Sequence, residues 1–369
     1  MLYEQINVKK GLKNLVTLKE LARMCNVSTS TISNILNGKP KVSEETRQRV
    51  MEVVRQTGYQ PNYFAQGMRM QKTRTIGIIV EDLNEFSTTP MVEATMAYCE
   101  DKNYRTILLN MRLYDKWQDT WYDDENKLQS VLQPTIRELL SYKVDGIMYI
   151  AGHCRVVNCF PEHFDIPAIV VYAISKAPGF PSVVLDDEKG GYDMTKYLIG
   201  MGHRKIGLIA GTEENLHTQK RSLGYQRVLF EEQILYNPDL IIYGDWTRQS
   251  GYEGAKKLIE EGVTAIFCMN DTMAAGAYDY LYEHDIKIGQ DVSVVGYDNK
   301  EISEYLRPKL TTNDLRLGEI GRESAERILR MIEDEDAECT NSEIIRMPCK
   351  IVERESVCRL PNECILHNA

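Results

Sequence analysis

The 369 residues contain no run that approaches eighteen consecutive apolar positions, and the N-terminal stretch MLYEQINVKKGLKN lacks both an apolar segment and a cleavage site. A membrane-spanning helix needs about twenty apolar residues, and an exported chain needs a leader. The nine cysteines are odd in number and follow no regular framework, which indicates reduced thiols. These absences predict a cytoplasmic protein without a membrane partner.

Motifs for catalysis are also missing. No nucleophile elbow, P-loop or GxGxxG opening a helix after the first predicted strand occurs in the chain. One stretch holds His153, Cys154, Cys159 and His163, but its spacing fits no common zinc finger and Pro161 interrupts it. We therefore predict no enzyme activity, no cofactor and no metal, with a plain loop at this stretch.

Basic residues are concentrated near the N-terminus. Up to Thr75 there are thirteen Lys and Arg against five Asp and Glu, whereas the rest of the chain has thirty-one against forty-nine. Only the N-terminal part can be attracted to a polyanion, because the acidic remainder would be repelled by it. The charge distribution thus places nucleic acid at one end of the chain.

The segment from Leu18 to Asn37 predicts two short helices with a turn between them. Thr17 and Ser28 stand at N-cap positions, and Asn26 lies where the turn needs a positive φ. Apolar residues recur at helical spacing in both halves of the segment, at Leu18, Leu21, Ala22, Ile32, Ile35 and Leu36. The pattern is typical of a helix-turn-helix, whose second helix enters the major groove of DNA, although a helical hairpin in a core would share it.

A third helix is predicted downstream. Ser43 would cap it, Val50, Val53 and Val54 would cover the first two helices, and Gly58 would end it. Its presence favours the DNA-binding interpretation over the hairpin, because a helix-turn-helix needs a covering helix to complete its core.

The motifs VTLKELARMCNVSTSTISNILNG, KVSEETRQRV, GYQPN and TRTIGIIV follow one another in this order. Together with GHRKIGLIAG, NDTMAAGAYDYL, DVSVVGYDN and RPKLTT they resemble the lactose-repressor/galactose-repressor family of bacterial transcription regulators over almost the whole chain. The resemblance and the helix pattern imply that the DNA-contacting residues are Thr17, Ser28, Thr29, Ser30, Thr31, Ser33, Asn34, Asn37, Tyr59, Asn62 and Met68.

The resemblance also implies a hinge helix, here Asn62 to Met70, which folds in the minor groove with Met68 as an apolar wedge. Nine residues with Gly67 near the end are too few for an isolated helix, so its order would come from the DNA and the partner hinge.

After Arg74, short apolar runs alternate with helical patterns in two series, which predicts two α/β halves with parallel sheets covered on both faces. The resemblance implies a core like that of periplasmic sugar-binding proteins, with three chain crossings near Pro181, Thr312 to Leu317, and Ile345. The stretch from Glu353 to Ala369 shows no heptad repeat, so we expect a homodimer through the core and no tetramerising coiled coil.

The predicted fold is therefore an all-α helix-turn-helix headpiece plus two doubly wound parallel-sheet subdomains of periplasmic-binding-protein-like type. The expected boundaries are 17–60 for the headpiece, 61–74 for the hinge and linker, and 75–345 for the core. Within the core we expect an N-terminal half of about 75–181 and 317–345, and a C-terminal half of about 182–313 and 346–357.

Polar and aromatic side chains follow several predicted strands, where the cleft between doubly wound halves would lie. By resemblance, Arg221, Asn270 and Asp298 match the effector-contacting residues of the family, and Trp246 matches the aromatic that stacks on the ligand. An indole can lie on the apolar face of a sugar while the polar groups bond its hydroxyls. These four positions predict a sugar-like effector.

In the N-terminal half, Asp82 and Phe86 follow the first predicted strand and could line the effector pocket. Tyr172 stands where many sugar-responsive relatives carry an acidic or amide residue, which weakens the case for a simple hexose. The stretch from Arg112 to Asn126 is long and aromatic: it could rim the cleft with Trp117, Trp121 and Tyr122 for a larger glycoside, or form a solvated or partner-facing loop.

The sequence thus predicts a repressor of carbohydrate-utilisation genes that binds a pseudo-palindromic operator as a dimer and is released by a sugar-like effector. A corepressor-dependent regulator of the same family is the alternative. A small-molecule receptor without DNA function would have no use for Leu18 to Asn37.

Overall fold

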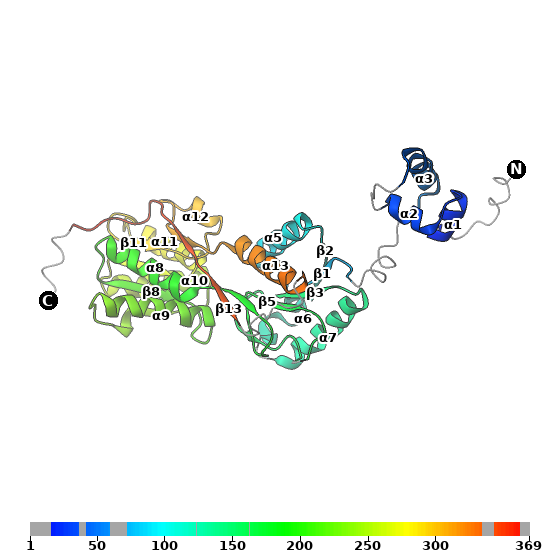
Figure 1. The fold of residues 1–369 in the computed structure, drawn as a ribbon. Coiled ribbons are helices and arrows are strands. Elements are labelled where there is room, and N and C mark those ends of the chain that lie inside the picture. The colour runs from blue at the N-terminus through cyan, green and yellow to red at the C-terminus, as the bar shows by residue number, and fades with distance from the viewer. Residues whose placement is uncertain are drawn as a thin grey trace. The chain divides into compact units, whose positions relative to one another are not determined.

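The computed structural model describes residues 16–36, 42–59, 72–122, 124–161, 163–333 and 343–361. The chain divides into two units, residues 1–73 and 74–369, which we describe separately as headpiece and core (Figure 1). Asn37 and the predicted hinge helix with Asn62 and Met68 lie outside the described residues.

The described residues of the headpiece form three helices: α1 (Leu18–Met24), α2 (Thr29–Leu36) and α3 (Glu44–Thr57). Their ends follow the sequence signals. Thr17 caps α1 in a capping box with Glu20, Ser43 caps α3, and Gly58 ends α3 in the left-handed conformation with a φ of 62°. Asn26 takes a φ of 51° in the turn between α1 and α2, as predicted.

Among the described residues, six buried ones form the headpiece core, and they come from the three helices and the end of α1: Leu21, Ala22, Cys25, Ile32, Ile35 and Val50. The predicted Leu18, Leu36, Val53 and Val54 pack against them from partly buried positions. The helices therefore hold one another through a small apolar centre, which leaves the polar face of α2 exposed to solvent.

The N-terminal half of the core is a six-stranded parallel sheet in the order β13-β7-β5-β3-β1-β2. Its helices α5 (Thr88–Asp101) and α13 (Leu317–Glu333) pack against each other, and α13 contacts β3, β5 and β7. The strands are β1 (Thr75–Val80), β2 (Arg105–Asn110), β3 (Gly146–Ile150), β5 (Ala168–Val171), β7 (Ser182–Leu185) and β13 (Ile344–Met347). Two short strands, β4 (Val156–Val157) and β6 (Ile174–Ser175), pair beside this sheet.

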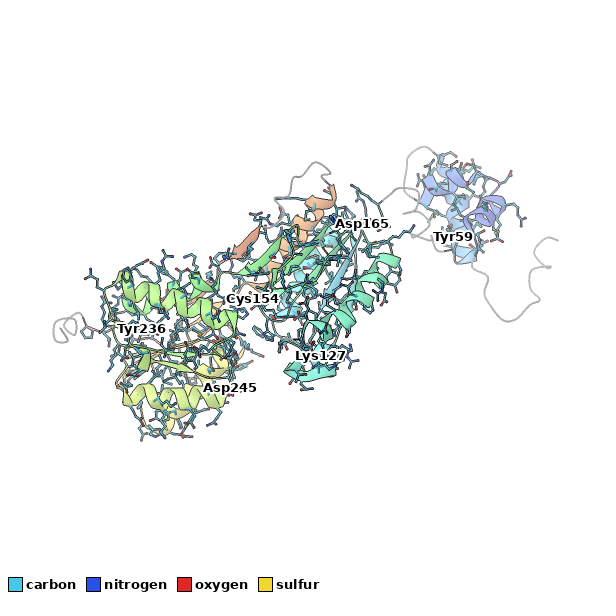
Figure 2. All side chains as sticks on the ribbon, turned by 90° about the horizontal axis from the view of Figure 1, so that it is seen from below. Tyr59, Lys127, Cys154, Asp165, Tyr236 and Asp245 are labelled. Atoms are coloured by element: carbon cyan, nitrogen blue, oxygen red, sulfur yellow. The ribbon has the colours of Figure 1, made fainter. Side chains whose placement is uncertain are left out.

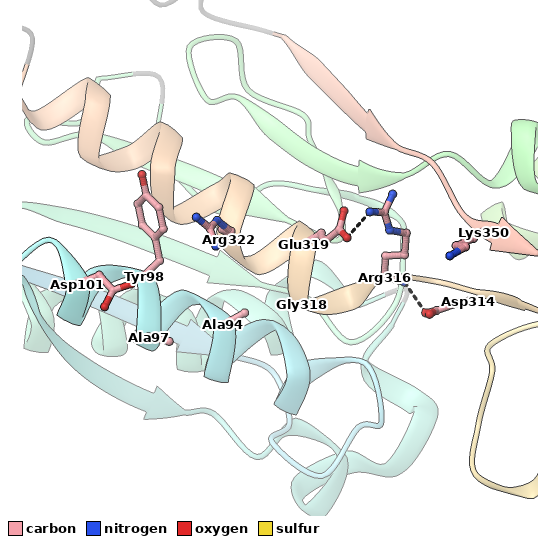
Figure 3. A pocket seen from close by; sticks show the side chains of 10 residues that line it. All are labelled: Ala94, Ala97, Tyr98, Asp101, Asp314, Arg316, Gly318, Glu319, Arg322 and Lys350. Carbon is pink, nitrogen blue, oxygen red and sulfur yellow. Dashed lines mark hydrogen bonds and ion pairs between the residues drawn. The ribbon is translucent and has the colours of Figure 1, made fainter. Parts of the chain in front are cut away.

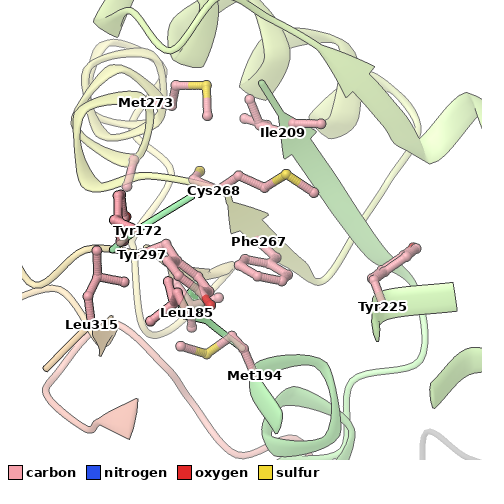
Figure 4. Close-up of a cluster of buried hydrophobic side chains, with 14 of the residues drawn as sticks. Tyr172, Leu185, Met194, Ile209, Tyr225, Phe267, Cys268, Met273, Tyr297 and Leu315 are labelled. Atoms are coloured by element: carbon pink, nitrogen blue, oxygen red, sulfur yellow. The ribbon is translucent and has the colours of Figure 1, made fainter. Parts of the chain in front are cut away.

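The C-terminal half is a four-stranded parallel sheet in the order β11-β10-β8-β9, covered by two helix pairs, α8 with α9 and α10 with α11. The strands are β8 (Ile206–Ala210), β9 (Ile241–Tyr243), β10 (Ala265–Cys268) and β11 (Ser293–Val295). The helices are α8 (Asp187–Gly200), α9 (Leu216–Glu231), α10 (Arg248–Glu260) and α11 (Asp271–Glu283), with short α12 (Ile302–Tyr305) and the 3-10 turn η2 (Pro238–Leu240). Figure 4 shows Tyr225, Phe267 and Tyr297 among its buried side chains.

The chain passes between the halves at three places, but the first lies later than Pro181 and the third lies later than Ile345, because β13 belongs to the N-terminal sheet as far as Met347. β7 pairs with β5 and β13, so residues 182–185 belong to the N-terminal sheet and the crossing falls at Asp186. The continuous apolar run of β7 suits either sheet, and only its neighbours decide between them. The other two crossings pair as an antiparallel ribbon, β12 (Thr312–Asp314) with β14 (Lys350–Val352).

The aromatic stretch from Arg112 to Asn126 folds onto the N-terminal half. It forms α6 (Leu113–Trp117) and the 3-10 turn η1 (Gln118–Trp121), and then enters α7 (Glu125–Ser141). Trp121 is 2% exposed in the core, so it cannot rim a cleft as one sequence interpretation proposed. α7 runs through Pro134 without a break, because buried Leu128, Leu132, Ile136 and Leu139 outweigh the helix penalty of this proline.

Candidate functional site: a polar helix and a closed cleft

The outer face of α2 carries the residues predicted to contact DNA. Thr29, Ser30, Thr31, Ser33 and Asn34 are partly or fully exposed, whereas Ile32 and Ile35 between them are buried. The helix therefore presents short hydroxyl and amide side chains on one side, which is the chemistry that base edges and phosphates accept.

Four of the predicted DNA-contacting residues, Thr17, Ser28, Ser30 and Thr31, already have bonds inside the headpiece. The Ser28 hydroxyl accepts from the backbone N–H of Thr31 and lies 2.7 Å from the Ser30 hydroxyl, while Thr17 caps α1. Tyr59 packs against the headpiece core, and this burial raises the pKa of its phenol. A loss of DNA binding after mutation of Thr17 or Tyr59 would therefore include a structural component.

Arg221 is the centre of a buried ion pair in the core. It lies on α9 and is 3% exposed; its Nε donates to Asp187 Oδ1 at 2.8 Å and its Nη1 donates to the Met269 carbonyl at 2.5 Å. Its guanidinium also lies 3.7 Å from the ring centroid of Tyr297. The side chain is thus fixed by the protein itself, and the only groups left for a ligand are its remaining guanidinium N–H donors.

His217 lies one helical turn before Arg221 and shares the same carboxylate. Its Nδ1 is 2.7 Å from Asp187 Oδ2. Burial alone would raise the pKa of Asp187, but His217 and Arg221 outweigh it and hold this pKa below the ordinary value. The other ring nitrogen, Nε2, accepts from the backbone N–H of Cys154 in the N-terminal half at 3.1 Å. Figure 2 shows Cys154 where the two halves of the core meet.

Trp246 is half-buried beside this cluster, with its ring centroid 5.9 Å from the Arg221 guanidinium. Its backbone has a φ of 69°, unusual for a bulky residue, and its carbonyl accepts from the side chain of Asn270. The indole covers Gly211 so closely that a Cβ there would stand 2.0 Å from a ring carbon. The Asn270 side chain also caps α11. Its amide therefore holds both the backbone of Trp246 and the start of this helix in position.

Lys300 contacts both Asp298 and Phe86. The ammonium of Lys300 lies 3.2 Å from Asp298 Oδ2 and 4.0 Å from the Phe86 ring centroid. Burial raises the pKa of Asp298, and burial together with the nearby Asp298 charge raises the pKa of Asp271 to about 8. Lys300 thus connects a strand end of the C-terminal half to the loop after β1 in the N-terminal half.

Tyr172 is buried with a φ of 61°, and its ring lies 5.5 Å from that of His217. Burial raises the pKa of its phenol well above the ordinary value. The site thus brings together five of the seven predicted effector residues, Tyr172, Arg221, Trp246, Asn270 and Asp298, around Asp187 and His217.

Asp82 is bonded to a different part of the N-terminal half. Its carboxylate accepts from the backbone N–H of Tyr114 and so ties the aromatic insertion to the end of β1. Its neighbour Glu81 is 1% exposed. The Glu81 carboxylate accepts hydrogen bonds from both terminal nitrogens of Arg155, from the Tyr149 hydroxyl and from the backbone N–H of Gly152. Arg155 in turn lies 4.6 Å over the Trp121 ring.

Sequence reasoning missed Asp187, His217, Glu81 and Arg155. Glu81 directly follows β1 and Asp187 is the second residue after β7, so the strand-end rule applied to Asp298 could have found them. His217 and Arg155 lie at a helix start and in a loop, and neither position carries a local pattern that separates it from a surface residue.

A cavity of about 580 Å³ lies outside the cleft, between α5 and α13 (Figure 3). Tyr98, Arg322 and Glu319 line it from the two helices, and Arg316 and Lys350 line it from the crossing segments. Within the part of the chain that the structure describes, no helix has the length and apolar character to span a bilayer, and no three His, Cys, Asp or Glu side chains converge as metal ligands.

Known protein families match both the headpiece and the core. Residues 17–62 match the family model "Bacterial regulatory proteins, lacI family", and residues 195–357 match "Periplasmic binding protein-like domain". The transcriptional repressor PurR of Vibrio parahaemolyticus is 32% identical over 351 residues, which cover 94% of this chain and all of the relative. The ribose operon repressor of Haemophilus influenzae is 32% identical over 87% of this chain and 93% of its own.

Solved structures share the architecture. The lac repressor dimer bound to operator and an anti-inducer superposes with a TM-score of 0.74 over 93% of this chain and 99% of its own, at 24% identity. A regulator from Enterococcus faecium with bound ribose gives 0.57 over 78% of this chain and 100% of its own, at 27% identity. With a helix-turn-helix headpiece and two parallel-sheet halves in one chain, this protein belongs to the LacI family of bacterial transcription regulators.

Proposed function

We propose that the chain represses carbohydrate-utilisation genes by binding a pseudo-palindromic operator as a homodimer, and that a sugar-like effector in the core cleft releases it. The proposal of a sugar-like effector rests on one observation: the half-buried indole of Trp246 lies beside Arg221, whose charge acts on Asp298. An aromatic face next to charged hydrogen-bonding groups suits a ring that is apolar on its face and hydroxylated at its edge. Binding, and not catalysis, is the proposed activity.

The relatives support a function in transcription regulation, but they do not identify the effector. The E. faecium neighbour holds ribose, and the H. influenzae relative is a ribose operon repressor, both of which favour a sugar. An aromatic platform stacks equally well on a purine, so a corepressor that strengthens operator binding is the alternative. Thermal-shift screening against mono- and disaccharides and against purines separates the two, because a ligand stabilises the core by RT ln(1 + [L]/Kd).

Trp246→Ala should abolish the thermal shift produced by the effector while operator affinity without effector stays within a few fold. The indole is the stacking surface, and the mutation leaves the ion pair of Arg221 in place. Gly211→Ala is the matched variant, because its new Cβ must displace the indole. A full effector response in both variants would remove Trp246 from the site.

Asn34→Ala should relax one base-pair position in each operator half-site. A side-chain amide can bond adenine N6 and N7 together, which is worth about 1–3 kcal/mol of discrimination. Selection of operator sequences from a random pool, with wild type alongside, measures the preference directly. An unchanged selected motif would leave Asn34 as a residue of the helix face with no role in base recognition.

A further inference from the structure

The cavity between α5 and α13 is large enough for a small metabolite. Its volume is about 580 Å³, and small-molecule pockets usually measure about 300–1,000 Å³. Small residues leave the space open where the two helices meet, since a Cβ added at Gly318 of α13 would lie 3.8 Å from the Cβ of Ala94 on α5. None of the seven predicted effector residues lines this cavity, so it is a separate place in the core.

Two of the three cations that line the cavity have no anionic partner among the described residues. Arg316 is paired with Glu319. The guanidinium of Arg322 lies over the Tyr98 ring, 5.4 Å from its centroid, and forms no ion pair with a described residue. The Lys350 side chain forms neither an ion pair nor a hydrogen bond within the described part of the chain. Both of these charges are therefore available to a ligand.

The two available cations lie on different elements. Figure 3 shows Arg322, on α13, to one side of the pair between Arg316 and Glu319, and Lys350, at the start of β14, to the other side. One small ion cannot contact both, because the ion pair lies between them. A ligand that bonds Arg322 and Lys350 together must carry two anionic groups on one molecule.

The acidic side chains of the lining do not neutralise these two cations. The Asp314 carboxylate accepts from the backbone N–H of Arg316 at 2.9 Å, and Asp101 lies beside Tyr98 at the far end from Lys350 (Figure 3). With three acidic and three basic side chains, the cavity has no net charge. Its attraction for an anion therefore depends on where the unpaired cations lie.

We propose that this cavity is a second ligand site, which takes a small molecule with two anionic groups, carboxylates or phosphates, bound between Arg322 and Lys350. A guanidinium matches the geometry of either anionic group, and an ammonium binds either as a point charge. Arg316 and Lys350 lie on segments that cross between the halves, so the ligand would join these segments to α13 of the N-terminal half. The site requires neither the cleft effector nor the operator.

Isothermal titration calorimetry of the full-length protein, without DNA or sugar, tests the site. Citrate and inorganic pyrophosphate are the probes, for a carboxylate and a phosphate ligand respectively, at constant ionic strength. Calorimetry is preferred to thermal shift because multivalent anions stabilise folded proteins without occupying a site. We expect at least one probe to bind, and Arg322→Gln and Lys350→Gln each to raise its Kd about tenfold, the equivalent of about 1.4 kcal/mol.

Three controls make the result specific. Arg330→Gln removes an exposed arginine of the same helix, paired with Glu326 outside the cavity, and should bind the probe as wild type does. Trp246→Ala should also bind it as wild type, because the indole belongs to the cleft. Acetate, with one anionic group, should bind at least tenfold more weakly than the probe.

The outcomes separate the two ligand chemistries and decide the proposal. Binding of citrate alone assigns a carboxylate ligand, binding of pyrophosphate alone assigns a phosphate ligand, and binding of both supports the chemistry that they share. The proposal is overturned if neither probe binds, if either cavity variant has the same Kd as Arg330→Gln, if acetate binds equally well, or if Trp246→Ala loses the probe. A failed effector screen would leave this result untouched.

Discussion

Replacing Arg221 with alanine should lower the free energy of unfolding of the core by about 3–5 kcal/mol, besides any effect on ligand binding. The substitution leaves Asp187, 4% exposed, with His217 as its remaining side-chain partner, and removing one member of a buried pair strands the other charge. Urea unfolding, followed on the core transition, measures the change.

Two control variants separate the buried charge from general damage. Arg227→Ala removes an arginine on the same helix whose ion pair with Glu231 is exposed, and such pairs are worth about 0–1 kcal/mol. The double change Asp187→Asn with Arg221→Met removes both charges and should recover part of the loss. A core as stable in Arg221→Ala as in Arg227→Ala would mean that the ion pair contributes nothing to stability.

This expectation changes how effector mutants are interpreted. From sequence, Arg221 is a ligand contact, and its loss should affect the response alone. Because the side chain is bonded to Asp187 and Met269, an unresponsive Arg221→Ala protein does not by itself establish contact with the effector. Trp246→Ala is the cleaner test, since no charge is left buried.

Ile32→Ala should unfold the headpiece and abolish operator binding while the core keeps its effector response. Ile32 is fully buried in a centre of six residues, and a buried isoleucine cut to alanine costs about 2–5 kcal/mol. A domain of this size has little stability to lose, because small domains bury a small fraction of their surface.

Calorimetry should show the loss as a missing headpiece transition beside an unchanged core transition, since the two units are separate in the fold. Asn34→Ala, on the same helix but partly exposed, is the control and should retain both transitions. Operator binding by Ile32→Ala at wild-type affinity would mean that the headpiece does not depend on this core.

Sequence patterns were enough to predict those parts of the structure that depend on residues close together in the chain. Caps at Thr17 and Ser43, the positive φ of Asn26 and apolar spacing defined the headpiece, and alternating runs predicted the parallel strands of both halves. Interactions within a few residues leave a readable period or a cap, because hydrogen bonding and burial there depend on near neighbours. The strand-end rule likewise pointed to Asp298 and Trp246.

The sequence by itself thus determined the family, the two-unit organisation and the α/β class of the core. Only the tertiary structure decided that β7 joins the N-terminal sheet, that Trp121 is buried over Arg155, and that Asp187 holds Arg221 and His217 together. These contacts join residues 12 or more positions apart, 30 and 34 for the bonds of Asp187, and the energy of those bonds depends on how separate segments converge in a low-dielectric interior. No period or motif along the chain records that convergence, so the hydrogen bond between His217 and Cys154 becomes visible only in the folded core.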